Sequence, residues 1–115
     1  MKTHKEMKLE YKLRKSKCGV FRIKNLINGK MYVAGSKDLE KIWNSERFKL
    51  NLGSHKNKRL QQEWRDYGES AFEFAILYEI PLKDDDNPKN YEEDIKSYEE
   101  LLIEEYDTKE GKGYN

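Results

Sequence analysis

The sequence of 115 residues contains little that could cross-link the chain or hold it in a membrane. Cys18 is the only cysteine, so no disulfide can form within the chain, and the reducing cytoplasm is the natural compartment. No apolar run approaches the roughly 18 residues that a transmembrane helix needs. The opening stretch, MKTHKEMKLEYKLRKSK, also lacks the apolar segment of a secretion signal. The sequence therefore predicts a soluble, cytoplasmic protein with no membrane partner.

Proline and apolar residues are also scarce. Both prolines fall within PLKDDDNPKN at 81–90, which is predicted to be a loop between ordered elements. Apolar residues make up 36% of the chain and charged residues 39%, which is dilute for a globular protein, but aromatic residues at 12% argue against disorder. A chain of this length predicts one compact domain.

The net charge of +1 conceals a division along the chain. Residues 1–60 hold 17 Lys and Arg against 5 Asp and Glu, whereas residues 61–115 hold 6 against 17. One interpretation is surface solvation, with the two halves partly neutralising each other in space. The other is a basic face that meets phosphates, with an acidic back. The sequence alone leaves both open.

Apolar periodicity predicts three strands and three helices after a basic arm. Two strands, GVFRIKN and KMYVAG, flank Asn28-Gly29, a dipeptide that accepts the positive φ angles of a tight turn. Ser36 to Asp38 are predicted to cap the first helix. Glycines are predicted to end the first two helices. The remaining elements are helices at 38–51 and 56–67, a strand at 71–80 and a last helix at 91–106.

The order strand-strand-helix-helix-strand-helix predicts an α+β fold, with a small, largely antiparallel three-stranded sheet flanked by helices. In the third strand, alternate apolar residues from Phe72 to Ile80 are expected to share one face. Residues 1–17 are predicted to be a basic arm or helix, and residues 18–115 the domain itself.

Several motifs occur in the order found in the GIY-YIG nuclease family, which this chain resembles from about residue 18 to residue 115. The family's two strand motifs are matched by Gly19-Val20-Phe21 and Tyr32-Val33-Ala34. The Asn-Gly turn, SHKNKRLQQEW, YGESAFEF and the terminal GYN follow in family order. The resemblance implies a domain that hydrolyses phosphodiester bonds in DNA.

The resemblance also implies a set of site residues. In the family a tyrosine hydroxyl positions or deprotonates the attacking water, an arginine and a histidine or tyrosine on the first helix contact the phosphate or leaving group, and a glutamate on the last helix holds Mg²⁺ or Mn²⁺. Here Tyr32 matches the second-motif tyrosine, and Glu99 matches the metal ligand, with Glu100 as the alternative. Asn115 matches the closing asparagine, or is a frayed chain end.

Three site positions depart from the family pattern, and Ala34 in place of the second motif's glycine is a smaller departure. Phe21 stands in place of the first-motif tyrosine. The family's first helix has the pattern Lys-Arg-Trp-x-x-His, and this chain has KIWNSE, so that Ile42 replaces the arginine and Glu46 the histidine. Residues four apart share a helical face, so these two side chains are expected to point into the phosphate site and repel its charge. The basic neighbours Lys41 and Arg47 are displaced around the helix by about 100°.

The resemblance with these departures favours a degenerate site that binds DNA with little or no cleavage. Domains with eroded catalytic residues also occur beside DNA-binding modules in bacterial transcription regulators. The residues expected to contact nucleic acid are Lys41, Arg47, Lys56, Lys58 and Arg59, unless they only keep the helices soluble.

Two alternatives stay open. One is a metal-dependent endonuclease with residual activity, in which Tyr32 and Glu99 suffice with help from Lys41 or Arg47. The other is a protein-interaction module or homo-oligomer, in which the basic half of one chain meets the acidic half of another. His55 lies where the family often has a similar residue, and it forms no metal-binding spacing with Cys18.

Overall fold

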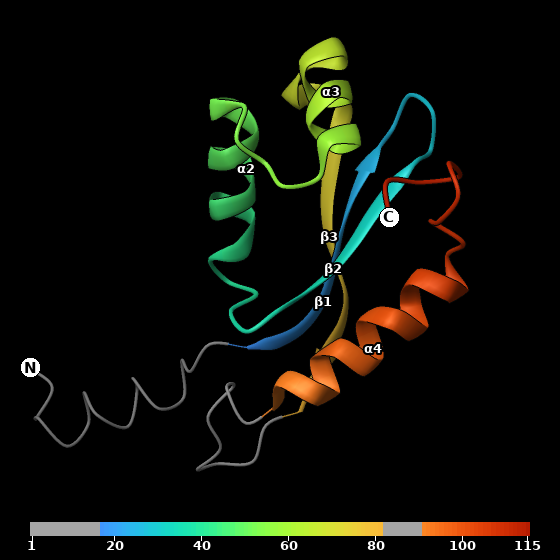
Figure 1. Ribbon diagram of the computed structural model, residues 1–115. Helices are drawn as coiled ribbons and strands as arrows, with labels where there is room; N and C mark the ends of the chain where they lie inside the picture. Colours follow the sequence, from blue (N-terminus) through green and yellow to red (C-terminus); the bar gives the residue numbers. More distant parts are fainter. Residues whose placement is uncertain (1–16, 82–90) are drawn as a thin grey trace, which may run out of the picture.

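The computed structural model describes residues 17–81 and 91–115 as a three-stranded sheet with helices on both faces (Figure 1). The strands β1 (Cys18–Asn25), β2 (Met31–Ser36) and β3 (Phe72–Ile80) are antiparallel and lie in the order β2-β1-β3. The helices are α2 (Ile42–Leu52), α3 (Lys58–Tyr67) and α4 (Glu92–Glu105), with a short 3-10 turn, η1 (Glu69–Ala71), before β3. The predicted α+β fold is confirmed.

Residues 1–16 and 82–90 lie outside the described part of the chain, so the prediction of a basic arm and most of the predicted loop fall there. Within the described residues, no helix is long and apolar enough to cross a membrane.

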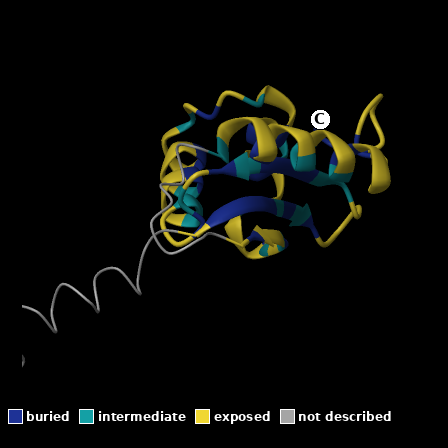
Figure 2. Ribbon diagram, turned by 90° about the horizontal axis from the view of Figure 1, so that it is seen from below, coloured by how far each residue is buried: buried dark blue, intermediate teal, exposed yellow. Residues whose placement is uncertain are grey.

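The buried residues are concentrated in the sheet, between the helices on its two faces (Figure 2). Their apolar side chains form a core on each face. On one face Phe21, Ile23 and Phe72 pack with Leu50 of α2 and Leu60 of α3. The opposite face is covered by α4. There the packed residues are Cys18, Val20, Val33, Ile80, Ile95 and Ile103. Alternation along β1 thus sends odd-numbered side chains to α2 and α3, and even-numbered ones to α4.

A bulge in β3 changes which face its side chains meet. The pairing with β1 shifts between Val20, opposite Tyr78, and Phe21, opposite Ile76, so Leu77 is an extra residue. Phe72 therefore packs towards α2 and α3, whereas Tyr78 stacks on Tyr98 of α4 at 4.6 Å between ring centroids. The expectation that apolar residues from 72 to 80 share one face is wrong, because the bulge reverses the alternation.

The β1–β2 turn is longer than its Asn-Gly signal predicts. Asn25 N–H donates to Lys30 O, and Gly29 N–H donates to Asn25 O, each at 2.8 Å, which closes a four-residue loop over 26–29. Gly29 has a φ of 78°, but Asn28 is not among the positive-φ residues. Asn28 instead accepts from Lys30 N–H and donates to Glu63 of α3. The predicted positive φ at Asn28 is therefore wrong.

Helix α2 begins four residues later than predicted. Ser36 Oγ accepts from Asp38 N–H and Asp38 Oδ1 accepts from Lys41 N–H, so these side chains close a turn rather than cap the helix. Leu39 is buried, and its N–H donates to Lys17 O at 2.7 Å, which holds this turn against the start of β1. Ile42 is consequently the first residue of α2.

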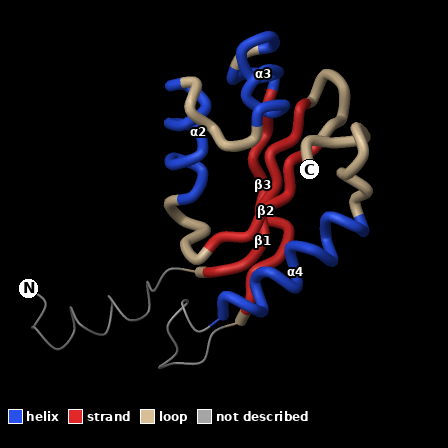
Figure 3. Tube along the Cα trace, in the orientation of Figure 1, coloured by secondary structure: helices blue, strands red, loops and turns tan. Residues whose placement is uncertain are grey.

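The C-terminal tail runs back beside β2 (Figure 3). Tyr114 N–H donates to Met31 O at 3.0 Å. The Asn115 amide accepts from Val33 N–H and donates to Val33 O, each at 2.8 Å, and its Oδ1 also accepts from Thr108 Oγ1 at 2.9 Å. Because β2 is an edge strand, these bonds pair backbone groups that would otherwise be open. The interpretation of Asn115 as a frayed end is wrong.

Replacing Asn115 with alanine should lower the free energy of unfolding by about 2 kcal/mol. Three hydrogen bonds are lost, each worth roughly 0.5–1.5 kcal/mol, and Val33 is left with open backbone groups. Urea denaturation of the wild type and the variant measures the change. An equally stable variant would mean that water replaces the amide without cost.

Candidate active site

A cavity of about 350 Å³ lies at the β2 edge of the sheet. At an edge strand, helices from opposite faces of the sheet can both reach the same space, and here α2 and α4 do so. The lining residues come from β2, α2, the segment before α3, α4 and the C-terminus: Tyr32, Val33, Ala34, Gly35, Ile42, Glu46, Lys49, Ser54, Lys56, Glu99 and Asn115.

Glu99 enters the cavity from α4. Its Oε2 accepts from Gly35 N–H on β2 at 2.7 Å, which fixes the carboxylate beside the strand. A Cβ on Gly35 would lie 2.4 Å from Ile95 Cγ2 and 3.0 Å from Glu99 Oε2, so only glycine allows this approach. Glu100 is exposed and does not line the cavity. Of the two glutamates considered from the sequence, Glu99 is the one that faces this space.

Three residues of α2 line the cavity at helical spacing. Ile42, Glu46 and Lys49 follow one another by four and three positions, so they share one face of the helix. Ile42 and Glu46 therefore lie with Tyr32 and Glu99, as their spacing predicted. Lys49 was not among the residues singled out from the sequence. Extending the same spacing by one more turn beyond Glu46 would have identified it.

Glu46 is buried, at 5% exposure, and pairs with His55. Its Oε2 lies 2.5 Å from Nε2 of the imidazole. The other ring nitrogen, Nδ1, accepts from Asn57 N–H at 3.0 Å, so it carries no proton. The imidazole is therefore neutral and donates its Nε2–H to the Glu46 carboxylate. This pair does not supply a positive charge to the cavity.

Tyr32 packs against the histidine of the pair and is itself buried. Its ring meets the His55 ring edge to face, with 5.4 Å between centroids. Burial raises the pKa of the Tyr32 hydroxyl, and the carboxylates of Glu46 and Glu99 raise it further. The hydroxyl stays protonated at neutral pH, so it can donate a hydrogen bond to a phosphate or water.

Stability should therefore fall in alkali through Tyr32. Its pKa is raised in the folded state, so above about pH 10 the unfolded chain loses a proton that the folded chain keeps. Folding stability is full below that pH and then falls by up to about 1.4 kcal/mol per pH unit for each such group. Tyr32→Phe should flatten this fall between pH 9 and pH 11. Urea denaturation of both proteins measures it, and equal slopes would contradict the assignment.

Other residues proposed from the sequence lie outside the cavity. Phe21 is fully buried beneath it, 6.4 Å from the Tyr32 ring between centroids. Arg47 lies over the Trp43 ring at 5.9 Å and donates to Asn44. Neither Arg47 nor Lys41 lines the cavity, so the cations present there are Lys49 and Lys56.

The donor set suits a hydrated cation better than a fully protein-bound one. Within the described residues, no cluster of three or more His, Cys, Asp or Glu side chains could hold a metal ion. The cavity has two carboxylates, Glu46 and Glu99, each with one oxygen already hydrogen-bonded. Mg²⁺ is usually held by one or two carboxylates with waters and substrate phosphates, so Glu99 fits such an ion when a phosphate accompanies it.

Charge divides between the two faces of the sheet. Residues 41–59, around α2 and the start of α3, hold six Lys and Arg and one acidic residue. Helix α4, on the other face, holds seven acidic residues and one lysine. The cavity lies where the two meet. This arrangement agrees with a basic face and an acidic back, one of the two interpretations that the sequence left open.

Comparisons with known proteins agree with this fold and site. No family model matches the chain. Over 69 residues, 60% of its length, the chain is 41% identical to Intron-associated endonuclease 1 of Enterobacteria phage T4, and it spans 28% of that protein.

Two solved structures are similar over most of their length. One is the catalytic domain of the homing endonuclease I-TevI, with a TM-score of 0.72, 35% identity, and coverage of 85% of this chain and 96% of that one. The other is a glutamate-to-alanine mutant of the same catalytic domain, with a TM-score of 0.72, 37% identity, and coverage of 86% and 92%. Because nearly the whole of that domain is matched in sequence and in fold, this chain belongs to the GIY-YIG endonuclease family, as a relative of the I-TevI catalytic domain.

Proposed function

We propose that this chain is a GIY-YIG domain that binds DNA and cleaves it slowly or not at all. The observation that carries the proposal is the identity of two cavity-lining residues, Ile42 and Glu46. They face the space where the family supplies an arginine and a histidine. With Glu99 they leave two carboxylates and an apolar side chain where a phosphodiester would have to sit.

Phosphoryl transfer depends on positive charge placed at the reacting oxygens. Loss of a positioned arginine typically costs roughly 10³ to 10⁵ in rate, and loss of a hydrogen-bond donor costs roughly 10² to 10³. A divalent cation at Glu99 would neutralise charge on the phosphoryl oxygens. Tyr32 would hold a water or phosphate oxygen through its hydroxyl. Because the His55 imidazole is neutral and turned to Glu46, it does not replace the missing cation.

DNA as the ligand is supported by the charge of the face beside the cavity and by the relatives, which are intron endonucleases. The cations on that face include Lys41, Arg47, Lys56, Lys58 and Arg59, the residues expected from the sequence to contact nucleic acid. A predominance of cations of this kind attracts a polyanion and makes its binding depend on salt. The kinship with transcription regulators expected from the sequence has no support among these relatives, so the proposal is confined to DNA.

The test measures binding and cutting separately on the full chain. Fluorescence anisotropy with a labelled duplex should show binding that weakens steeply between about 50 and 200 mM salt. Supercoiled plasmid with Mg²⁺ or Mn²⁺ should stay uncut or be nicked very slowly. Rapid nicking that disappears in Glu99→Ala would overturn the proposal of a degenerate site, and absence of binding would overturn the DNA role.

A slow metal-dependent endonuclease is the second candidate, and Lys49 is the observation that favours it. Its side chain lines the cavity on the same face of α2 as Ile42, two turns further on. A lysine can balance charge on a phosphate without the paired hydrogen bonds of an arginine. If this candidate holds, trace nicking should require both Lys49 and Glu99. Trace nicking that persists in Lys49→Gln and in Glu99→Ala would point to contamination.

A further inference from the structure

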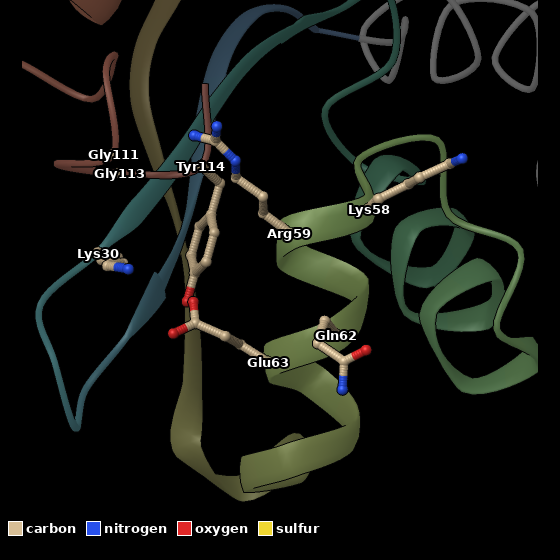
Figure 4. A pocket seen from close by; sticks show the side chains of 8 residues that line it. All are labelled: Lys30, Lys58, Arg59, Gln62, Glu63, Gly111, Gly113 and Tyr114. Carbon is tan, nitrogen blue, oxygen red and sulfur yellow. The ribbon is translucent and has the colours of Figure 1, made fainter.

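A second hollow, of about 480 Å³, has Tyr114 of the C-terminal tail in its wall (Figure 4). This groove lies between α3, the start of β2 and the C-terminal turn. Its lining residues are Lys30, Lys58, Arg59, Gln62, Glu63, Gly111, Gly113 and Tyr114. Its volume is within the roughly 300–1,000 Å³ of sites that hold small molecules or parts of larger ligands.

Three cations line the groove, and none of them forms an ion pair within the described residues. In the described part of the chain, Lys30, Lys58 and Arg59 have no ion pair and no side-chain hydrogen bond, whereas Arg22 pairs with Glu73. In Figure 4 Arg59 reaches from α3 towards Tyr114, and Lys30 lies on the β2 side of that ring. The Lys58 side chain points away from Tyr114 in Figure 4, so Lys30 and Arg59 are the charges of the groove that can meet an anion.

Glu63 is the single carboxylate among the lining residues of the groove, so its one negative charge stands beside three positive ones. Its Oε1 accepts from Asn28 Nδ2 of the β1–β2 loop at 2.6 Å. Burial raises the pKa of the Tyr114 hydroxyl, and the adjacent Glu63 raises it further. The Glu63 carboxylate therefore lies beside the Tyr114 hydroxyl, at the inner wall of the groove. The groove thus keeps a net positive charge.

The walls of the groove are fixed by close contacts. Tyr114 is buried, and its carbonyl accepts from Asn57 Nδ2 at 2.8 Å. At Gly113 an added Cβ would lie 2.8 Å from Met31 O and 2.8 Å from Thr108 Cβ. Asn57 also caps α3 by accepting from Leu60 N–H, which places the positive end of the helix dipole beside Lys58 and Arg59. An anion entering here meets a preformed site.

The groove and the candidate active site are lined by residues that are adjacent or nearly adjacent in the sequence. Asn115 lines the cavity and Tyr114 the groove; Lys56 lines the cavity and Lys58 the groove. Asn115 directly follows Tyr114, and only Asn57 separates Lys56 from Lys58, so the two hollows adjoin along the same two segments, and successive phosphates of one DNA strand are likewise close neighbours. One strand can therefore present phosphates to both hollows.

From this geometry we propose that the groove binds a phosphodiester of the same nucleic-acid strand, beside the phosphate that faces Tyr32 and Glu99. The groove is a positioning subsite: Lys30 and Arg59 hold the strand by its backbone, independent of base sequence. The inference rests on the proposed DNA binding. It adds that the strand follows the face of α3 that carries Arg59 and Glu63.

The test compares Lys30→Gln/Arg59→Gln with the wild type, in the full chain, by anisotropy on labelled duplexes of two unrelated sequences. Loss of two phosphate contacts should weaken binding to both duplexes alike and make the slope of log K against log salt shallower by about 2. Lys96→Gln, on the acidic helix α4, is the matched control and should bind like the wild type. Thermal unfolding shows whether each variant is folded, and Lys30→Gln alone, which removes no described side-chain bond, should give about half the change in slope.

The outcomes separate the two proposals. If the double variant binds DNA with the same affinity and the same salt slope as the wild type, the groove proposal is overturned and the proposed DNA binding stands. If the wild type does not bind DNA, both proposals are overturned. Amide NMR distinguishes the source of the phosphate, with Gly111 and Gly113 as reporters. Shifts caused by DNA at low salt support a strand subsite. Shifts caused by inorganic phosphate alone, with none from DNA, would make this a free-phosphate site and overturn the proposal.

Discussion

Replacing Ile42 with arginine and Glu46 with histidine should raise metal-dependent nicking of supercoiled plasmid by about 10²- to 10³-fold or more over the wild type. Both positions line the cavity with Tyr32 and Glu99, so the new side chains enter the space where a phosphate would sit. The change removes one of two carboxylates and adds an arginine beside Lys49 and Lys56. Nicked and linear products over time, in Mg²⁺ and in Mn²⁺, measure the gain.

Two controls make this gain specific. Ile42→Leu/Glu46→Gln removes the carboxylate without adding a cation, so it should raise DNA affinity above that of the wild type and change the rate of cutting much less. Adding Glu99→Ala to the arginine-histidine variant should abolish the gain. An imidazole at position 46 can still accept the Nε2–H of His55, so the fold should survive, which thermal unfolding checks. A folded variant that binds DNA and cuts no faster would show that the missing cations are not what limits cleavage.

The sequence was sufficient for the fold because its local signals agree with the global arrangement. Apolar periodicity locates all three strands, and Gly53 ends α2 with a φ of 79°. The errors arise where long-range contacts decide. The Leu77 bulge depends on pairing with β1, and the late start of α2 depends on the bond from Leu39 N–H to Lys17 O. Neither contact leaves a periodic signal in the sequence.

The part of the candidate site that depends on helical spacing was predictable from the sequence. Positions 42 and 46 were expected to share a space with Tyr32 and Glu99, and all four line one cavity. The role of His55 was not predictable in this way. It joins Glu46 from a loop after α2, and only the folded chain shows that Asn57 N–H fixes its tautomer. The sequence predicted a carboxylate at position 46 that points into the phosphate site, and the structure adds that this carboxylate is paired with a buried histidine.

Replacing His55 with alanine should lower the free energy of unfolding by about 3–5 kcal/mol. The His55 side chain is 0% exposed and the Glu46 side chain 7% exposed, so removing the imidazole leaves a buried carboxylate without its donor. Asn57 N–H loses its acceptor, and a cavity opens beside the Tyr32 ring. Glu46→Ala should cost less, about 1–3 kcal/mol, because it leaves only a neutral N–H unpaired.

The double variant His55→Ala/Glu46→Ala should then lose about 1–3 kcal/mol less unfolding free energy than the two single losses added together. The reason is that it no longer buries a charge without a partner. Urea denaturation at neutral pH measures the cycle. Lys112→Ala is the matched control, because its pair with Asp107 lies at 63% and 65% exposure and should contribute little. Additive single effects would contradict the pair. Strong coupling would mean that His55 holds Glu46 in place, so that the acidic side chain is built into the cavity by the fold as well as by its position on α2.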